Sequence, residues 1–355
     1  MKKKVILFID ENKKINNSIQ RKIGIEILRF ILCFRIVLLH YYSSDNRFIN
    51  KLRKNFFQVP CFFFISFYFL YPIVIYKRNI LKMRMRLERL LIPFIIYPLF
   101  FWSINNLLFL LFKINRFGRY LTIRELKTQL IVGRGIPNLS ILWFQFNLII
   151  STLFFFISSF LLKRYFLIFF QFIGSISYIF QYSGINSDFF NQYMVGTLPI
   201  IMPVGNLIEI LPIAATAFSL SSINKRKNIS CINLRYLFFT VFFFILISHY
   251  NIFTNIQGYS SPGFKPLINS LLLFITFYRI PFETINNKIL KIIIHIIKYT
   301  PGIYCLHRLV MHYISLIFRK KGTFIGCIIV YIISYFLSYI GSLIFSKTKL
   351  KYLFN

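Results

Sequence analysis

Acidic residues are scarce in this chain. Its 355 residues include 9 Asp and Glu against 43 Lys and Arg, giving a formal net charge of +34 at pH 7. Charged residues of both signs make up only 15% of the sequence, whereas hydrophobic residues reach 57%. A soluble globular protein of this length carries more charge and less apolar surface. The composition therefore argues against a soluble fold and predicts a polytopic membrane protein.

Signals for metal, nucleotide and nucleic-acid binding are also missing. No pair among the five cysteines has the spacing of metal ligands, and no glycine-rich nucleotide-binding loop is evident. The basic residues cluster in short segments between apolar runs. This pattern favours contact with anionic membrane lipid over nucleic acid. We expect neither a metal nor a nucleic-acid partner.

Long apolar runs predict an all-α integral membrane bundle of about ten transmembrane helices. The predicted spans are residues 23–43, 56–76, 90–112, 141–162, 165–182, 206–222, 234–251, 266–284, 301–318 and 323–346. Residues 188–203 are short and broken by Pro and Gly, which predicts a re-entrant or interfacial segment. Residues 289–298, ILKIIIHIIK, are too short to span and predict an amphipathic helix. The loop 113–140 is expected to hold a surface helix around TIRELKTQL.

The charge distribution predicts that both termini are cytoplasmic. With this topology, 26 basic residues lie inside and 14 outside, in agreement with the positive-inside rule. The predicted organisation is a basic cytoplasmic tail at 1–22, a transmembrane domain at 23–346 and a short cytoplasmic tail at 347–355.

The first span carries ionisable residues along one face. Arg29 and His40 are eleven residues apart, which is three helical turns plus about 20°. Glu26 precedes Arg29 by three residues, within reach of an ion pair. Arg35 falls on another face. The stripe is either a structural Glu–Arg pair with a histidine bonded to a neighbouring helix, or a polar path that ends in an imidazole suited to proton transfer.

The first two spans resemble those of a known family. In IGIEILRFILCFRIVLLHYY, an acidic residue precedes a Leu-Arg pair, and a histidine follows after ten intervening residues: Glu26, Leu28-Arg29 and His40. The second span, VPCFFFISFYFLYP, is similar to the pattern Val-Pro-x-Phe-Phe-x-Ile-Ser-Gly, with Phe67 in place of the glycine. These motifs resemble the acyltransferase-3 family of multi-spanning membrane acyltransferases.

Later motifs extend the resemblance over about residues 24–346. RMRLERLLIPF is similar to the basic start of the family's third helix, with Arg86 and Arg89 matching, and LWFQFNLII resembles its Leu-Trp-Phe segment. GIYCLHRLV resembles a late Gly-Ile-Tyr-Leu-x-His segment and makes Tyr304 and His307 candidate substrate-binding residues.

The resemblance implies transfer of an acyl group, commonly acetyl, from acyl-CoA to a hydroxyl of a cell-surface saccharide or lipid-linked sugar. Acyl-CoA would be a co-substrate, with no tightly bound cofactor, and the bacterial inner membrane would be the location. His40 would act as general base or as an acyl relay, with Glu26 and Arg29 lining the path. Arg86 and Arg89 would bind the phosphates of coenzyme A; by position alone they fit a positive-inside anchor in a basic loop, and the resemblance favours the phosphate role.

Two other functions fit the sequence. A transporter or flippase of a saccharide or other polar substrate also uses intramembrane Arg, Glu and His, but no inverted repeat is evident. A paralogue with the fold and no turnover is the third reading, because Phe67 departs from the family pattern.

Overall fold

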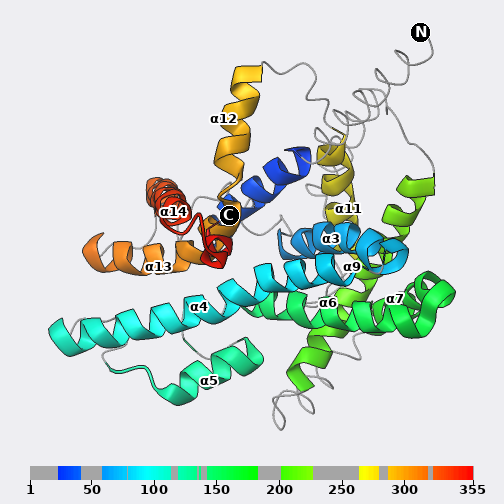
Figure 1. Ribbon diagram of the computed structural model, residues 1–355, viewed down its shortest axis with the longest axis horizontal. Coiled ribbons are helices and arrows are strands. Elements are labelled where there is room, and N and C mark those ends of the chain that lie inside the picture. Colours follow the sequence, from blue (N-terminus) through cyan, green and yellow to red (C-terminus); the bar gives the residue numbers. More distant parts are fainter. Residues whose placement is uncertain are drawn as a thin grey trace.

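In the computed structural model of the chain, the ionisable stripe lies on a helix formed by residues 23–40 (Figure 1). The structure describes residues 23–40, 58–77, 79–112, 119–133, 136, 142–182, 201–226, 264–279, 287–318 and 323–354. Within these ranges every regular element is a helix, so the predicted all-α fold is confirmed.

The labelled helices follow one another along the chain with short connections in several places. They are α3 (Gln58–Tyr71), the π-helix η1 (Pro72–Lys77), α4 (Ile80–Phe112), α5 (Ile123–Val132), α6 (Trp143–Leu162), the 3₁₀ helix η3 (Lys163–Tyr165), α7 (Phe166–Tyr182), α9 (Ile201–Arg226), α11 (Phe264–Tyr278), α12 (Asn287–Ile297), α13 (Thr300–Phe318), α14 (Phe324–Ile344) and the 3₁₀ helix η5 (Lys349–Leu353).

Nine of the ten predicted spans coincide with helices in the described part of the chain, and the predicted span 234–251 lies outside it. The predicted re-entrant segment 188–203 also lies outside it, except for its last three residues, which begin α9. The short amphipathic segment is confirmed as α12, and the surface helix is confirmed as α5. The third span is longer than predicted, because α4 already begins at Ile80.

Length and composition independently mark several of these helices as membrane spans. Among the described residues, Ile80–Leu111, Trp143–Ile179 and Phe324–Ile344 are long and apolar enough to cross a membrane. The pair Lys288–Ile297 and Thr300–Ile314, bent by 51°, qualifies as a fourth if it is one span. The protein is therefore an integral membrane helical bundle.

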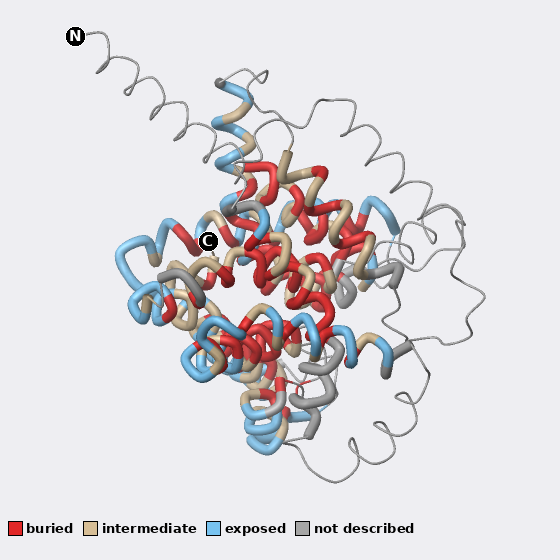
Figure 2. The backbone as a smooth tube through the Cα atoms, turned by 90° about the vertical axis from the view of Figure 1, so that its right-hand side faces the viewer, coloured by how far each residue is buried: buried red, intermediate tan, exposed pale blue. Residues whose placement is uncertain are grey.

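The first helix joins two packed groups of helices. Its first half, through Ile25, Leu28 and Leu32, belongs to a buried apolar cluster built mainly by α3, α6, α7, α9 and α11. Its second half, through Cys33 and Val37, packs with α13 and α14. Figure 2 shows that the buried residues concentrate in the middle of the bundle, while exposed residues lie around it. This helix therefore brings its polar face to the junction between the two groups.

Phe67, which departs from the family pattern, is accommodated by the first of these clusters. Its ring is fully buried and lies edge-on to Phe155 and Phe218, with centroid separations of 5.2 and 6.2 Å, and it stacks on Phe63 at 5.8 Å. Aromatic pairs in these geometries are favourable. The side chain therefore takes part in the packing between α3, α6 and α9.

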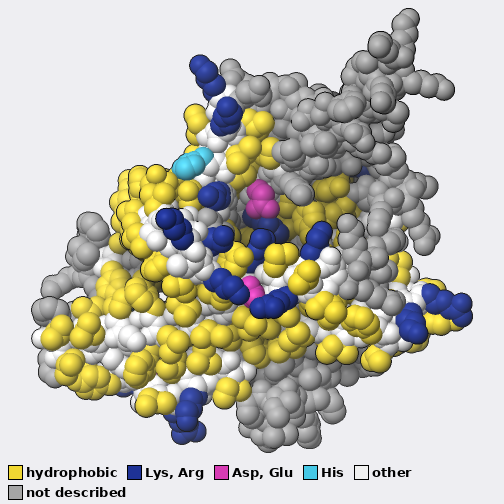
Figure 3. Space-filling model, viewed as in Figure 1, with side chains coloured by type: hydrophobic (Ala, Val, Ile, Leu, Met, Phe, Trp, Pro, Cys, Tyr) yellow, Lys and Arg dark blue, Asp and Glu magenta, His cyan; other side chains and the backbone are white. Residues whose placement is uncertain are grey.

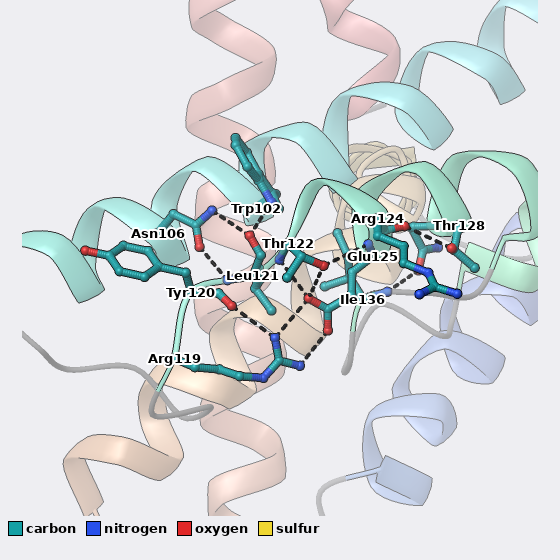
Figure 4. Close-up of polar contacts among 11 residues, drawn as sticks. Trp102, Asn106, Arg119, Tyr120, Leu121, Thr122, Arg124, Glu125, Thr128 and Ile136 are labelled. Carbon is teal, nitrogen blue, oxygen red and sulfur yellow. Dashed lines mark hydrogen bonds and ion pairs between the residues drawn. The ribbon is translucent and has the colours of Figure 1, made fainter.

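A network of polar contacts holds α5 against α4 (Figure 4). Trp102 Nε1 donates to the Leu121 carbonyl at 2.8 Å, and the Asn106 side chain bonds both the amide and the carbonyl of Leu121. Thr122 and Glu125 then form a capping box, in which each side chain bonds the backbone N–H of the other residue. These bonds satisfy amides at the start of α5 that have no partner within the helix.

Gly302 allows close contact between α13, α14 and the end of the chain. A Cβ added at this position would lie 2.5 Å from Ser338 Oγ on α14 and 2.8 Å from the carbonyl oxygen of Phe354. Both distances are too short for any side chain. Gly302, in the GIYCLHRLV motif, thus allows α14 and the chain around Phe354 to pack closely against α13.

Candidate functional site

His40 lies at the end of the first helix and faces α13. An Nη2 nitrogen of Arg308 is 2.8 Å from His40 Nδ1. The ring of His307, also on α13, stacks against His40 with a centroid separation of 5.9 Å and an interplanar angle of 16°. His40 is partly buried and His307 is fully buried. The structure thus brings two of the residues singled out in the sequence, His40 and His307, together across 267 residues.

His307 is held in place by its own helix. Its Nδ1 lies 2.6 Å from the carbonyl oxygen of Tyr304, one turn earlier. The Tyr304 ring packs with Phe62 and Phe144 at centroid separations of 6.1 and 5.9 Å. Tyr304 therefore contributes to the site through its backbone carbonyl, and its ring fills the space between α13, α3 and α6.

Glu26 and Arg29 form the ion pair that their spacing predicts, with 2.6 Å between Glu26 Oε1 and Arg29 Nη1. About one third of each side chain is exposed. Arg29 also lies close enough to Arg86 of α4 for the two guanidinium groups to repel each other. The first half of the stripe therefore combines a Glu–Arg ion pair with a second cation nearby, Arg86 of α4.

Arg86 and Arg89 start from the same helix and point to different neighbours. Arg86 Nη2 donates to Ser66 Oγ at 2.6 Å and to the Ser66 carbonyl oxygen at 3.3 Å, whereas its buried Nε has no hydrogen-bond partner in the described part of the chain. Arg89 lies over the ring of Tyr352, with 5.5 Å from Cζ to the ring centroid. Because α4 begins at Ile80, both arginines stand inside a helix rather than at its first turn.

The segment predicted as a short C-terminal tail folds back onto α4. Its 3₁₀ helix η5 contacts α4, α13 and α14. The Tyr97 hydroxyl donates to the Leu353 carbonyl at 2.6 Å, and Lys349 Nζ lies 3.0 Å from Glu88 Oε1. Basic and acidic side chains gather in the middle of the face shown in Figure 3, between apolar surfaces. The C-terminal segment therefore adds cations to the end of α4 that carries Arg86 and Arg89.

The remaining histidines lie elsewhere or outside the described residues. His295 on α12 packs edge-on to Tyr299 and Tyr339, at 5.5 and 5.7 Å. His312 is buried next to Phe101. His249 lies outside the described residues. Arg35, which the sequence places on another face of the first helix, is buried.

Arg308 is the site residue that the sequence analysis did not select. Its signal was present, because it is a charged residue within a predicted span and follows His307 directly. Charged residues in spans generally face a protein interior and have a partner. The partner, His40, lies 268 residues away in the sequence, and only the folded chain identifies it.

Among the described residues, no group of three or more His, Cys, Asp or Glu is placed to hold a metal ion. The four described cysteines, Cys33, Cys61, Cys305 and Cys327, are buried and unbridged, as expected for packing residues.

Comparison with known families agrees with the motifs. No curated protein and no solved structure matches the chain. A family model described as an acyltransferase domain, Acyl_transf_3, matches residues 22–347, which is nearly the whole chain and includes both histidines and all of the arginines described above. The chain therefore belongs to the acyltransferase-3 family of membrane acyltransferases.

Proposed function

We propose that this membrane acyltransferase moves an acetyl group from acetyl-CoA to a hydroxyl of a cell-surface saccharide or lipid-linked sugar. The observation that carries the proposal is the contact of His40 with Arg308 and His307, within a chain of the acyltransferase family. An imidazole and a guanidinium side by side combine a proton acceptor with a fixed positive charge. These are the two functions that acyl transfer to a hydroxyl requires.

His40 is the group that we place at the reacting carbonyl. As general base it takes the proton of the acceptor hydroxyl while the hydroxyl oxygen bonds the acyl carbon, and the C–S bond then breaks. As an acyl relay, its nitrogen first takes the acyl group from the thioester and then passes it to the hydroxyl. Both routes need a ring nitrogen with an available lone pair, and both end with the proton on the thiol of coenzyme A.

Arg86 and Arg89 are the proposed phosphate-binding residues for the donor. Two observations support this role for Arg86: its guanidinium repels that of Arg29, and its Nε is buried without a hydrogen-bond partner among the described residues. A phosphate group relieves the repulsion and accepts from the free N–H. Arg89 and Lys349, at the same end of α4, extend the positive surface for the other phosphates.

The positive-inside distribution supports a cytoplasmic donor and cytoplasmic termini, and the family supports the bacterial inner membrane as the location. Glu26 and Arg29 lie near the cytoplasmic end of the first helix in this orientation, and His40 lies near the outer end. The thioester arm of the donor then extends from the α4 cations towards His40, while the acceptor approaches from the opposite side.

The test uses purified protein in nanodiscs, radiolabelled acetyl-CoA and candidate glycans. His40→Ala is expected to lower the rate of labelled product formation by about 10²–10⁴, the usual contribution of a general base. His295→Ala is the matched control, since His295 packs against Tyr299, which follows α12, and Tyr339 of α14, and this variant should retain wild-type turnover. Equal rates for His40→Ala and wild type would overturn the proposal. Movement of intact glycan across vesicles without acyl transfer would indicate a transporter instead.

A further inference from the structure

The contact between Arg308 and His40 determines which ring nitrogen carries the proton. A guanidinium has five N–H donors, no acceptor, and does not lose its proton in proteins. Arg308 Nη2 therefore donates, and His40 Nδ1, at 2.8 Å, accepts. A neutral imidazole has one N–H and one lone pair. With the lone pair on Nδ1, the ring proton of His40 is on Nε2.

His307 is held in the opposite form. Its Nδ1 lies 2.6 Å from the Tyr304 carbonyl oxygen, which only accepts, so Nδ1 carries the proton and Nε2 has the lone pair. That Nε2 is buried and has no hydrogen-bond partner in the part of the chain that the structure describes. Two stacked rings thus have different nitrogens protonated, each fixed by a partner on α13. The hydrogen-bond partner of each ring therefore selects its tautomer.

We propose that Arg308 is a catalytic residue with two roles: it keeps Nδ1 of His40 unprotonated, so that Nδ1 takes the acceptor proton, and its guanidinium then donates to the oxygen of the reacting acyl group. This inference rests on the proposed acyl transfer and names the working atom and the residue that selects it. The acceptor hydroxyl displaces Arg308 Nη2 from the lone pair of His40 Nδ1. The released guanidinium then turns to the neighbouring acyl carbonyl.

The charges that develop during proton transfer explain why an arginine lies next to His40. When the hydroxyl proton passes to Nδ1, the imidazole becomes positive beside a guanidinium, and two like charges in a poorly hydrated site repel. In the same step the new C–O bond pushes an electron pair onto the carbonyl oxygen. The resulting oxyanion offsets both cations, and donors placed at a developing oxyanion are strongly stabilising. On collapse the C–S bond breaks, and the proton moves from Nδ1 to the sulfur.

The chain offers matched variants for a test. Arg308→Met keeps an unbranched side chain and removes every donor, whereas Arg308→Lys keeps a donor-only cation. Arg35→Met is the control for loss of a buried arginine, because Arg35 is buried on the same helix as His40 and faces a different side. Thermal unfolding of each purified variant identifies those that are folded.

The first measurement needs no activity. Protein labelled with ¹⁵N-histidine in nanodiscs is examined by NMR, and His40→Ala assigns the His40 signals. We expect wild type and Arg308→Lys to show an unprotonated Nδ1 and a protonated Nε2, and Arg308→Met to lose this preference while Arg35→Met keeps it. A protonated Nδ1 in wild type, or an unchanged Nδ1 signal in Arg308→Met, would overturn the proposal.

The second measurement is acetyl transfer. We expect Arg308→Met to lower kcat by about 10²-fold, as does loss of one oxyanion donor, with little change in the KM for acetyl-CoA. Arg308→Lys should recover at least part of this loss, and Arg35→Met should keep wild-type kcat when folded. Wild-type kcat in Arg308→Met would refute the role. If wild type transfers no acyl group, the proposed function fails, and the NMR result still decides the tautomer.

Discussion

Replacing Arg86 by Ala is the sharpest test of how the donor is bound. Arg86 leaves Nε buried without a partner in the described part of the chain and lies close to a second guanidinium, that of Arg29. A hydrogen bond to a charged partner contributes about 1.5–3 kcal/mol. Loss of one such bond to a phosphate therefore weakens acyl-CoA binding by a factor of about 10–150.

Replacing Ser66 should have the opposite effect on the affinity for the donor. In the structure Arg86 Nη2 donates to Ser66 Oγ at 2.6 Å, and a phosphate bound to both Nε and Nη2 must compete with that hydroxyl for Nη2. A neutral hydrogen-bond partner contributes about 1 kcal/mol net. Ser66→Ala removes the competitor and should tighten donor binding up to about 5-fold. The backbone carbonyl of Ser66, at 3.3 Å, remains in both proteins.

Equilibrium binding of tritiated acetyl-CoA to protein in nanodiscs measures both effects. Arg84→Ala is the control for bulk charge, because Arg84 is exposed and pairs with Glu88 on its own helix. Acetyl-pantetheine, which lacks the phosphates, should bind wild type and Arg86→Ala equally. The reasoning is refuted if Arg86→Ala binds acetyl-CoA as wild type does, or if Ser66→Ala weakens binding as much as Arg86→Ala.

Three further outcomes follow from the fold. Gly302→Ala places a Cβ 2.5 Å from Ser338 Oγ and should destabilise the protein by about 1–3 kcal/mol. Ser338→Gly should restore part of this loss in a double-mutant cycle, measured by unfolding in mixed micelles. Additive effects of the two substitutions would contradict the contact. Thr122→Ala removes the cap of α5 at a cost of about 1 kcal/mol, which should speed amide exchange in that helix about 5-fold, and unchanged exchange would refute the cap. The hydrogen bond that Arg119 donates to Glu125 lowers the pKa of Glu125 from its ordinary value of 4.5 to about 2. The stability that this carboxylate contributes is therefore fully present above pH 4.5 and is lost as the pH falls towards 2. Arg119→Gln should raise the pKa of Glu125, and an NMR titration that still places it near 2 in the variant would disprove the assignment.

The sequence predicted the helices well because lipid imposes a simple rule on them. In a bilayer every backbone polar group must be bonded within the segment, so a long apolar run becomes a helix whatever lies around it. Local spacing was equally reliable: the Glu26–Arg29 pair and the capping box at Thr122 depend on neighbours three residues apart. The start of α4 was less predictable, because charged residues continue a helix as readily as they anchor a loop.

The sequence by itself therefore determined the all-α membrane bundle, the acyltransferase family and the stripe that carries Glu26, Arg29 and His40. Only the tertiary structure decided what that stripe faces. The partner of His40 is on α13, the hydroxyl that holds Arg86 is on α3, and the C-terminal segment returns to α4. These contacts join residues that are 20 to 268 positions apart. Periodicity fixes which side of a helix a residue lies on, but packing among all the helices fixes which neighbour it meets.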